Sequence, residues 1–276
     1  MCASDPRSLH FCFSTLGCPD LDLDAVFDLA KRFGFGIVEL RALEGTVDLP
    51  ALFEKRYGSP EAFAEHVFES GVRIASLDTS LKLMDNDADT RLAFLDFIPW
   101  AEAIGGTALR VFDGKVRADE DAEAGWRRAA ETMHWWDDEH KASEWQSTMI
   151  VETHDTVFTA ATIRRLMEHA PDSVGLLWDS HHTWKRGGED PLETWRACQQ
   201  WVRHVHFKDS VSKPSARHPF TYVDLGTGEF PLDAVLNALA ADAFSGPVSL
   251  EWEKMWHPYL RPLDEALEGG RQHGWW

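Results

Sequence analysis

The chain has few cysteines and no long apolar run. Four of its 276 residues are cysteine, and none of them forms a C-x-x-C pair. A chain of this size does not need disulfide bonds, so we expect reduced thiols in a cytoplasmic protein, at Cys2, Cys12, Cys18 and Cys198. The N-terminal segment MCASDPRSLH lacks the apolar core of a signal peptide. No window approaches the roughly 18 apolar residues that a membrane span needs.

Positive charge is also scarce. The chain has 27 Lys and Arg against 46 Asp and Glu, which gives a formal net charge of −19. No basic cluster offsets this excess, so nucleic acids and anionic membranes are poor partners. Hydrophobic residues make up 44 % of the chain, enough for a large core and unlike a disordered protein. We therefore expect a globular protein whose acidity serves solubility.

Short β-rich runs alternate with longer helical patterns along the whole chain. The predicted strands are 9–14, 36–41, 73–78, 107–112, 148–153, 174–179, 203–208 and 247–252. Apolar residues at three- and four-residue spacing predict helices at 23–33, 60–70, 89–104, 121–140, 160–169, 191–201, 232–240 and 262–271. The longest irregular stretch is 209–230. No linker or low-complexity segment marks a domain boundary.

This alternation predicts a single α/β domain over residues 1–276, a closed (β/α)8 TIM barrel. The predicted strands support closure, because side chains alternate between the two sides of a strand. One side of strands five, seven and eight is mostly apolar and suits packing under helices. The other side is polar and includes Glu152, His154, His204, His206, Lys208, Glu251 and Glu253. A polar barrel interior is costly unless its groups are paired or bind something.

Acidic residues and histidines gather at the ends of strands five to eight, which read VETHD, WDSHHTW, VHFKDS and LEWEKMW. The active sites of TIM barrels lie at this end of the strands. Each segment offers one residue that can reach a common point: Glu152, Asp179, His206 and Glu251. Any one of them alone is usually a hydrogen-bonded or capping residue. Together they form an oxygen-rich set that suits Mn²⁺, Mg²⁺, Co²⁺ or Fe²⁺ better than structural zinc.

These segments resemble the xylose isomerase-like TIM barrels of sugar and sugar-phosphate isomerases and epimerases. That group includes ketose 3-epimerases, hydroxypyruvate isomerase and inosose dehydratase. Besides the four ligand positions, the chain carries three further elements of the pattern. They are D-x-x-H (Asp179, His182), H-x-K-D (His206, Lys208, Asp209) and G-x-G (Gly226, Gly228). The motifs lie almost entirely in the second half of the chain, and they are more specific for the superfamily than for one substrate.

The resemblance implies a metal-dependent isomerase or epimerase that acts on a small sugar, keto-sugar or cyclitol by proton transfer through a metal-stabilised enediolate. Glu152 and Glu251 would move the proton on opposite faces of the substrate. Asp179 and His206 would be mainly ligands, and His182 would hydrogen-bond a substrate oxygen. Mn²⁺ is the expected ion, with Mg²⁺, Co²⁺, Fe²⁺ or Zn²⁺ as alternatives.

Further substrate contacts are predicted at His154, Lys208, Arg217 and Glu39. His154 either polarises a substrate hydroxyl or hydrogen-bonds a ligand. Lys208 either meets a substrate oxygen or balances the carboxylates, and we favour balance. Arg217 lies farther along the chain than the substrate-anchoring arginine of relatives, which weakens its case. Glu39, which faces inward with Arg41, has either a supporting or a distal substrate role.

The 13 tryptophans offer flat apolar walls for a sugar. Trp184 and Trp256, in predicted strand-to-helix loops, are the candidates for such walls. Trp178 and Trp252 are expected to pack under helices. The segment 225–231 either cradles a phosphate at a helix N-terminus or forms a tight turn. With so acidic a chain, we favour a substrate without phosphate.

Other functions are left open by the sequence. A lyase or dehydratase of the inosose, dehydroshikimate or keto-glycoside type would share the first chemical step. An endonuclease IV-like nuclease is disfavoured by the acidity and by the lack of histidine on strands two to four. A non-catalytic sugar-binding barrel is disfavoured by the complete ligand set. A homo-oligomer fits the resemblance, but no interface signal is readable.

Overall fold

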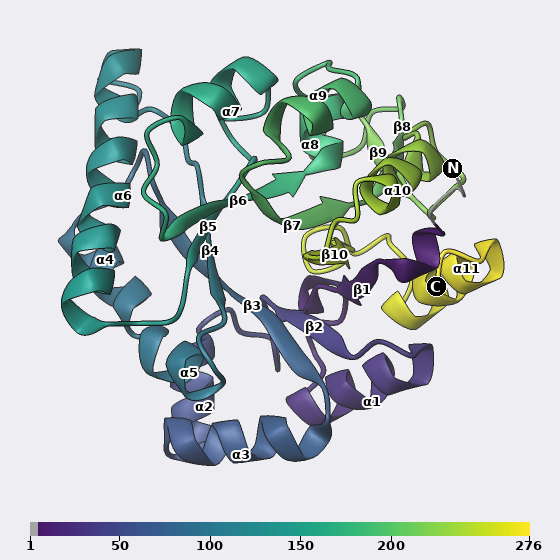
Figure 1. Ribbon diagram of the computed structural model, residues 1–276. Coiled ribbons are helices and arrows are strands. Elements are labelled where there is room, and N and C mark those ends of the chain that lie inside the picture. The colour runs from purple at the N-terminus through teal and green to yellow at the C-terminus, as the bar shows by residue number, and fades with distance from the viewer. Residues whose placement is uncertain (1–4) are drawn as a thin grey trace.

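A computed structural model describes residues 5–276 and shows eight parallel strands arranged around one axis (Figure 1). Their order in the sheet is β1-β10-β7-β6-β5-β4-β3-β2. A parallel bridge between Ser14 and Glu39 joins the two ends of this order, so the sheet closes on itself. The strands are β1 (His10–Phe13), β2 (Ile37–Leu40), β3 (Arg73–Lys82), β4 (Ala108–Phe112), β5 (Met149–Glu152), β6 (Val174–Asp179), β7 (Val202–Phe207) and β10 (Pro247–Leu250). The predicted TIM barrel is confirmed.

Helices surround the barrel and follow the predicted pattern (Figure 1). Several begin at the predicted start signals: the Ser59 side chain accepts the Ala62 N–H, and Asp190 accepts the Leu192 N–H. The outer helices are α1 (Leu23–Phe33), α3 (Pro60–Ser70), α4 (Ala88–Leu95), α5 (Ile98–Ala103), α6 (Ala122–Ser143), α7 (Ala160–Met167), α9 (Pro191–Cys198), α10 (Leu232–Ala241) and α11 (Leu263–His273). In the described residues, no helix is both long and apolar enough to cross a bilayer.

Four elements differ from the sequence expectation. Helix α2 (Leu49–Tyr57) was not predicted, although Asp48 caps it and Pro50 lies in its first turn. The expected helix 89–104 is split into α4 and α5, with Pro99 at the start of the second. The short helix α8 (Ser180–Lys185) follows β6 directly. The irregular stretch after β7 contains an antiparallel hairpin of β8 (Asp209–Val211) and β9 (Thr221–Val223).

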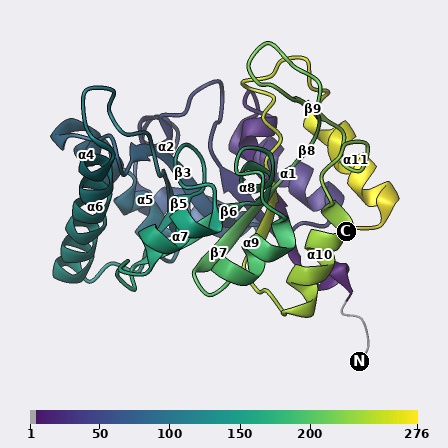
Figure 2. The same cartoon turned by 90° about the horizontal axis from the view of Figure 1, so that it is seen from above.

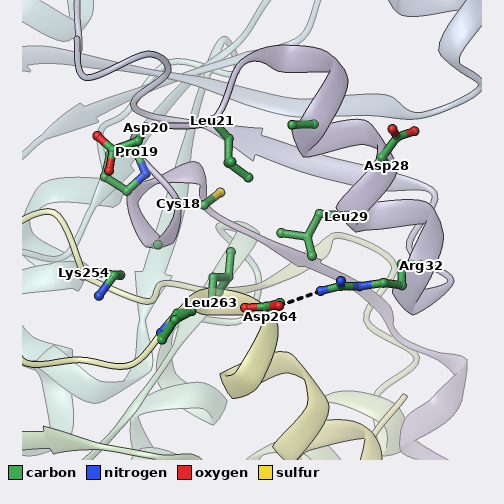
Figure 3. Close-up of a pocket in the computed structure, with 13 residues that line it drawn as sticks. Cys18, Pro19, Asp20, Leu21, Asp28, Leu29, Arg32, Lys254, Leu263 and Asp264 are labelled. Carbon is green, nitrogen blue, oxygen red and sulfur yellow. Dashed lines mark ion pairs between the residues drawn. The ribbon is translucent and has the colours of Figure 1, made fainter.

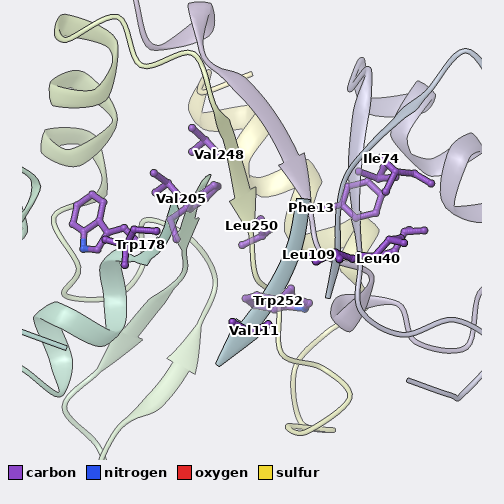
Figure 4. Close-up of a cluster of buried hydrophobic side chains, with 14 of the residues drawn as sticks. Phe13, Leu40, Ile74, Leu109, Val111, Trp178, Val205, Val248, Leu250 and Trp252 are labelled. Atoms are coloured by element: carbon purple, nitrogen blue, oxygen red, sulfur yellow. The ribbon is translucent and has the colours of Figure 1, made fainter. Parts of the chain in front are cut away.

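The main core lies between the barrel and its helices (Figure 4). Trp178 and Trp252 are fully buried, and Trp178 stacks on Trp195 of α9 with ring centroids 5.6 Å apart. Trp178 therefore packs under a helix as predicted, and Trp252 is buried with its Nε1–H donating to the Arg261 carbonyl just before α11. The inward sides of the strands carry buried polar groups instead, among them Asp78, Arg110, Glu152, His204 and His206. The described cysteines, Cys12, Cys18 and Cys198, are free; Cys2 lies outside the described residues.

The β8–β9 hairpin and the loop after β10 lie side by side on one side of the barrel (Figure 2). The Tyr222 N–H in β9 donates to Tyr259 Oη across 3.1 Å, which ties the two segments together. Tyr222 also packs edge-on against His257, with ring centroids 5.1 Å apart. Both segments follow strand ends, so they form one wall of the barrel mouth.

Candidate metal centre

Four side chains from four neighbouring strands converge inside the mouth. One potential ligand atom from each of Glu152, Asp179, His206 and Glu251 lies within 4.8 Å of the others. His206 Nδ1 is 3.7 Å from Glu152 Oε1 and 3.5 Å from Glu251 Oε2. All four residues are buried. The structure therefore brings together the four residues that the sequence predicts as metal ligands.

Several of these atoms have no hydrogen-bond partner in the described protein. Both carboxylate oxygens of Glu152 and His206 Nδ1 are buried and unpartnered. Asp179 Oδ2 makes no directed hydrogen bond, although the Lys208 ammonium lies 2.8 Å away. Buried polar atoms without partners are costly, and several carboxylates at one point repel each other. A divalent cation at their centre removes both costs, so the residues present fit a metal ion.

Asp179 is oriented by the start of α8. Its Oδ1 atom accepts the His182 N–H at 2.8 Å as the helix cap, which leaves Oδ2 to face the other ligands. Burial raises the pKa of Asp179 to about 6, although Lys208 lowers it and Glu251 raises it further. The D-x-x-H motif is thus a capping turn that aims one carboxylate oxygen into the cluster.

His206 is oriented by Glu39 of β2. Its Nε2 atom lies 2.8 Å from Glu39 Oε2, so Nδ1 faces the ligand cluster. The same Glu39 oxygen is 2.9 Å from His204 Nε2. Burial alone would lower the pKa of His206, but Glu39 and Glu251 raise it well above its usual value. Carboxylates behind metal-binding histidines commonly fix the ring in this way, so Glu39 has the position of a supporting residue.

Lys208 lies among carboxylates. Its ammonium contacts Glu251 Oε2 and lies 2.8 Å from Asp179 Oδ2 and 2.8 Å from Glu253 Oε1. Burial alone would lower the pKa of Lys208, but Asp179, Glu251 and Glu253 raise it well above its usual value. The ammonium is therefore charged, and these contacts match the balancing role favoured from the sequence.

Two histidines lie beside Glu152. His182 Nδ1 lies 3.1 Å from the Thr153 carbonyl oxygen, and donation to it leaves Nε2 as an acceptor. Burial and then Lys208 lower the pKa of His182 well below its usual value, so the ring is neutral. The His154 ring packs edge-on against it, with centroids 5.0 Å apart. Burial would lower the pKa of His154, but Asp155 and Glu152 raise it. One neutral and one chargeable imidazole thus flank Glu152.

Three predicted substrate residues take no part in the ion pairs and hydrogen bonds of the ligand cluster. Trp184 lies in α8, not in a loop, and packs against His181 and Phe230 with ring centroids 5.5 and 5.4 Å apart. Trp256, after β10, is 37 % exposed. Arg217 is exposed in the connection between β8 and β9. Their roles stay predictions.

The glycine-rich loop before α10 is filled by a carboxylate of the protein itself. Asp209 accepts the N–H groups of Gly226, Gly228 and Phe230 at 2.8–3.0 Å. A Cβ atom on Gly228 would lie 2.1 Å from Asp209 Oδ1. These donors are therefore not available to a phosphate, and the tight-turn interpretation holds. The H-x-K-D and G-x-G motifs are two parts of one packed unit.

A family model described as the xylose isomerase-like TIM barrel matches residues 27–273. The chain belongs to this family. Within it, a curated relative is the inosose dehydratase of Lacticaseibacillus casei, 36 % identical over 102 residues. That match covers 36 % of this chain and 32 % of the relative, so it spans about a third of each protein.

Solved structures share the fold with this chain at low sequence identity. One is the IOLI protein with a bound zinc atom, at 19 % identity and a TM-score of 0.75, covering 96 % of each chain. Another is the 3-keto-D-glucoside 4-epimerase YcjR from E. coli in its apo form, at 14 % identity and a TM-score of 0.73. That match covers 96 % of this chain and 98 % of YcjR.

This family member also carries an arginine at the site that sequence reasoning missed. Arg110 of β4 is 1 % exposed, with Nε 3.4 Å from Glu152 Oε2 and Nη2 3.5 Å from Asp78 Oδ2. Its guanidinium lies 4.0 Å above the Phe112 ring. The strand alternation pointed to it, because Leu109 and Val111 face the helices and leave Arg110 inward. Searching only for ligands on the later strands left it out.

A cleft of about 500 Å³ lies outside the barrel, between α1 and the start of α11 (Figure 3). Its lining includes Cys18, Leu29 and Leu263, and Arg32 pairs with Asp264 across 3.1 Å at its edge. None of the predicted site residues lines it. The candidate functional site of this family member is therefore the cluster of four potential metal ligands inside the barrel mouth, and not this cleft.

Proposed function

We propose that this protein is a divalent-metal-dependent isomerase or epimerase that moves a proton next to the carbonyl group of a small polyhydroxylated substrate. One observation carries the proposal. Glu152, Asp179, His206 and Glu251 present buried ligand atoms within 4.8 Å of one another, and several of those atoms have no hydrogen-bond partner in the described protein. A bound divalent ion supplies Lewis acidity that stabilises negative charge on a substrate oxygen.

Glu152 is the base in this proposal. Neither of its carboxylate oxygens accepts a hydrogen bond from the protein, so a lone pair is free to take the proton from the acidic carbon. Glu251 stands across the cluster and returns a proton to the same or the neighbouring carbon. Its Oε2 atom contacts the Lys208 ammonium, which lowers the basicity of Glu251.

His182 is the proposed partner of a substrate hydroxyl. Its Nδ1 atom faces the Thr153 carbonyl, so its free Nε2 accepts a hydrogen bond from that hydroxyl. The neutral state of the ring suits this role, because a charged ring has no acceptor. The arrangement orients the acidic carbon toward Glu152 without adding positive charge beside the base.

The family relatives support small carbohydrate-like substrates. Among them are an inosose dehydratase and a 3-keto-D-glucoside 4-epimerase, and a third binds zinc. The names of the first two refer to a keto-cyclitol and a keto-sugar. In such compounds the carbonyl group acidifies a neighbouring C–H bond. Since Asp209 fills the glycine-rich loop, a substrate without phosphate fits this site best.

Dehydration is the second candidate, and His154 is the observation that favours it. Its Nδ1 atom lies 3.2 Å from Asp155, and its pKa is raised despite burial. An imidazole paired with a carboxylate and placed near the base can provide a proton for a departing hydroxyl group, which an epimerase does not need. In this version Glu152 takes the C–H proton, the electron pair forms the C=C bond, and His154 protonates the leaving oxygen to give water.

The test is solvent isotope exchange. Metal-free protein reloaded with Mn²⁺ is incubated in D₂O with a panel of ketoses, inososes and keto-glucosides, and the products are followed by NMR. We expect deuterium at the carbon beside the carbonyl, and a rate that falls by about 10²–10⁴-fold in Glu152→Gln. The matched control Glu123→Gln removes an exposed carboxylate on α6 and should exchange like wild type.

The product identifies the reaction. A deuterated isomer or epimer supports the proposal, whereas loss of water with a conjugated product supports the dehydratase. Exchange that continues at the wild-type rate in Glu152→Gln would exclude Glu152 as the base.

A further inference from the structure

Glu253 joins the candidate metal centre to the wall of the mouth. It is the next inward residue after Glu251, and its side chain is 13 % exposed. Its Oε1 atom lies 2.8 Å from the Lys208 ammonium and accepts the Tyr222 hydroxyl at 2.7 Å. Its Oε2 atom lies 3.5 Å from His257 Nε2. Neither Glu253 nor Tyr222 has a role in the proposed function.

The contacts of Lys208 set up a competition. Two of its three carboxylate partners, Asp179 and Glu251, are proposed metal ligands, and the oxygens it contacts belong to the ligand cluster. An ammonium and a divalent cation attract the same oxygen atoms. A bound cation therefore has to share those oxygens with Lys208 or displace it. Of the three carboxylates that the described residues place beside this ammonium, Glu253 stands outside the ligand set.

We infer that Glu253 is a positioning residue that holds the Lys208 ammonium beside the ligands, so that Asp179 and Glu251 stay available to the cation. The inference rests on the proposed metal site. The long side chain of Lys208 has several rotatable bonds, so its position depends on the anions around it. With Glu253 in place, the ammonium keeps a full counter-charge when a cation takes the other two carboxylates.

Glu253 is itself held by the wall of the mouth. Tyr222 is 4 % exposed on β9, and its hydroxyl has Glu253 as its acceptor. The Tyr222 N–H donates to Tyr259 Oη, which links β9 to the loop after β10. This chain of contacts fixes the Glu253 carboxylate beside Lys208. The β8–β9 hairpin and the loop after β10 thereby influence how readily Asp179 and Glu251 can bind the cation.

The experiment measures Mn²⁺ affinity by isothermal titration calorimetry on metal-free, full-length protein, so it does not depend on any substrate. Glu253→Gln keeps the shape and an acceptor oxygen but removes the charge that holds Lys208. We expect its Mn²⁺ affinity to fall by about 10-fold or more, as for other residues that orient metal ligands. The double variant Lys208→Met with Glu253→Gln should regain the wild-type affinity or exceed it, because the competing ammonium is gone.

Glu229→Gln is the matched control. It removes one carboxylate near β8, where Glu229 pairs with Lys185 and Ser212 and touches none of the ligands. Its Mn²⁺ affinity should equal that of wild type, which separates the local effect of Glu253 from the change in net charge. Thermal unfolding of each metal-free variant checks that the barrel is intact.

The outcomes separate the inference from the proposed function. Wild-type protein that binds no Mn²⁺ would overturn the proposed metal site itself. If wild type binds and Glu253→Gln binds equally well, only the inference fails. It also fails if the loss in Glu253→Gln persists in the double variant, because Glu253 would then act by a route other than Lys208.

Discussion

The two halves of the barrel mouth differ in how their buried charged groups are balanced. In the half formed by β5, β6, β7 and β10, the four proposed ligands converge on one point. There the carboxylate oxygens of Glu152 and the Nδ1 atom of His206 have no hydrogen-bond partner. On β2 to β4, the ions compensate each other: Arg41 donates to the Asp78 carbonyl, and Arg110 lies 3.5 Å from the Asp78 carboxylate. In the first arrangement the unpartnered atoms converge on one point that a cation can occupy. In the second, Arg110 faces the Asp78 carboxylate within the protein, although Asp78 Oδ2 and two Arg110 nitrogens also lack hydrogen-bond partners.

We therefore expect the two halves to have different roles. Bare carboxylates weaken the metal-free fold and are retained where a ligand supplies the missing charge. A compensated pair holds its neighbours in place whether or not a ligand is bound. Substitutions in the later strands should therefore act mainly on metal binding, and substitutions in the earlier strands mainly on stability.

The largest effect is expected from Asp179→Asn. An amide keeps the cap on the His182 N–H but supplies no charge, so Mn²⁺ binding should fall below detection. In the metal-free protein this substitution relieves like-charge repulsion among the ligands but removes one of the counter-charges of Lys208. These two effects oppose each other, so the unfolding midpoint should stay close to wild type. Thermal unfolding with and without Mn²⁺ tests both statements, since a ligand at 100 times its Kd stabilises by about 2.7 kcal/mol. Undiminished stabilisation by Mn²⁺ in this variant would show that Asp179 is not a ligand.

The reverse pattern is expected from Arg110→Met. Removing the guanidinium leaves the buried Glu152 carboxylate without this counter-charge and makes ionisation of Asp78 still less favourable. This should cost about 3–5 kcal/mol of metal-free stability at neutral pH. Chemical denaturation of protein held in a metal chelator measures this loss. A variant as stable as wild type would contradict the view that the earlier strands brace the site.

The pH dependence of that loss has a defined sign. Burial and then Glu39 raise the pKa of Asp78 well above its usual value, and Arg110 opposes the shift. The Asp78 pKa is therefore higher in the folded protein than in the unfolded chain. Between these two pKa values the folded state holds a proton that the unfolded chain has released, so the free energy of unfolding falls as pH rises. Without Arg110 the Asp78 pKa of the folded protein rises further, which widens this interval. The loss of stability in Arg110→Met should therefore be smaller at pH 5 than at pH 8.

The smallest of these effects is expected from Glu39→Gln, which lies where the two halves meet. Gln loses the charge that fixes the His206 ring but keeps its size, so Mn²⁺ affinity should fall by about 10–100-fold without being abolished. Titration calorimetry on the variant and on wild type gives the comparison. An affinity equal to wild type would mean that the barrel packing alone orients His206.

Much of the fold was readable from local patterns. Alternating strands and helices predicted the barrel, and the period of two placed Trp178 outward and Glu152 inward, as the structure has them. The helix α2 was missed because it is only nine residues long, and the β8–β9 hairpin because its strands have only three residues each. Short elements are decided by packing against the rest of the molecule rather than by their own sequence.

The sequence by itself determined the strand order along the chain, the side of each strand that is polar, and the four residues offered as metal ligands. The tertiary structure alone decided what stands next to what: Glu39 behind His206, Arg110 beside Glu152, and Lys208 between the ligands and Glu253. The physical reason is range. Periodicity and capping act between residues a few positions apart, whereas the charges that position this site meet only after the barrel closes and brings distant strands within a few ångströms.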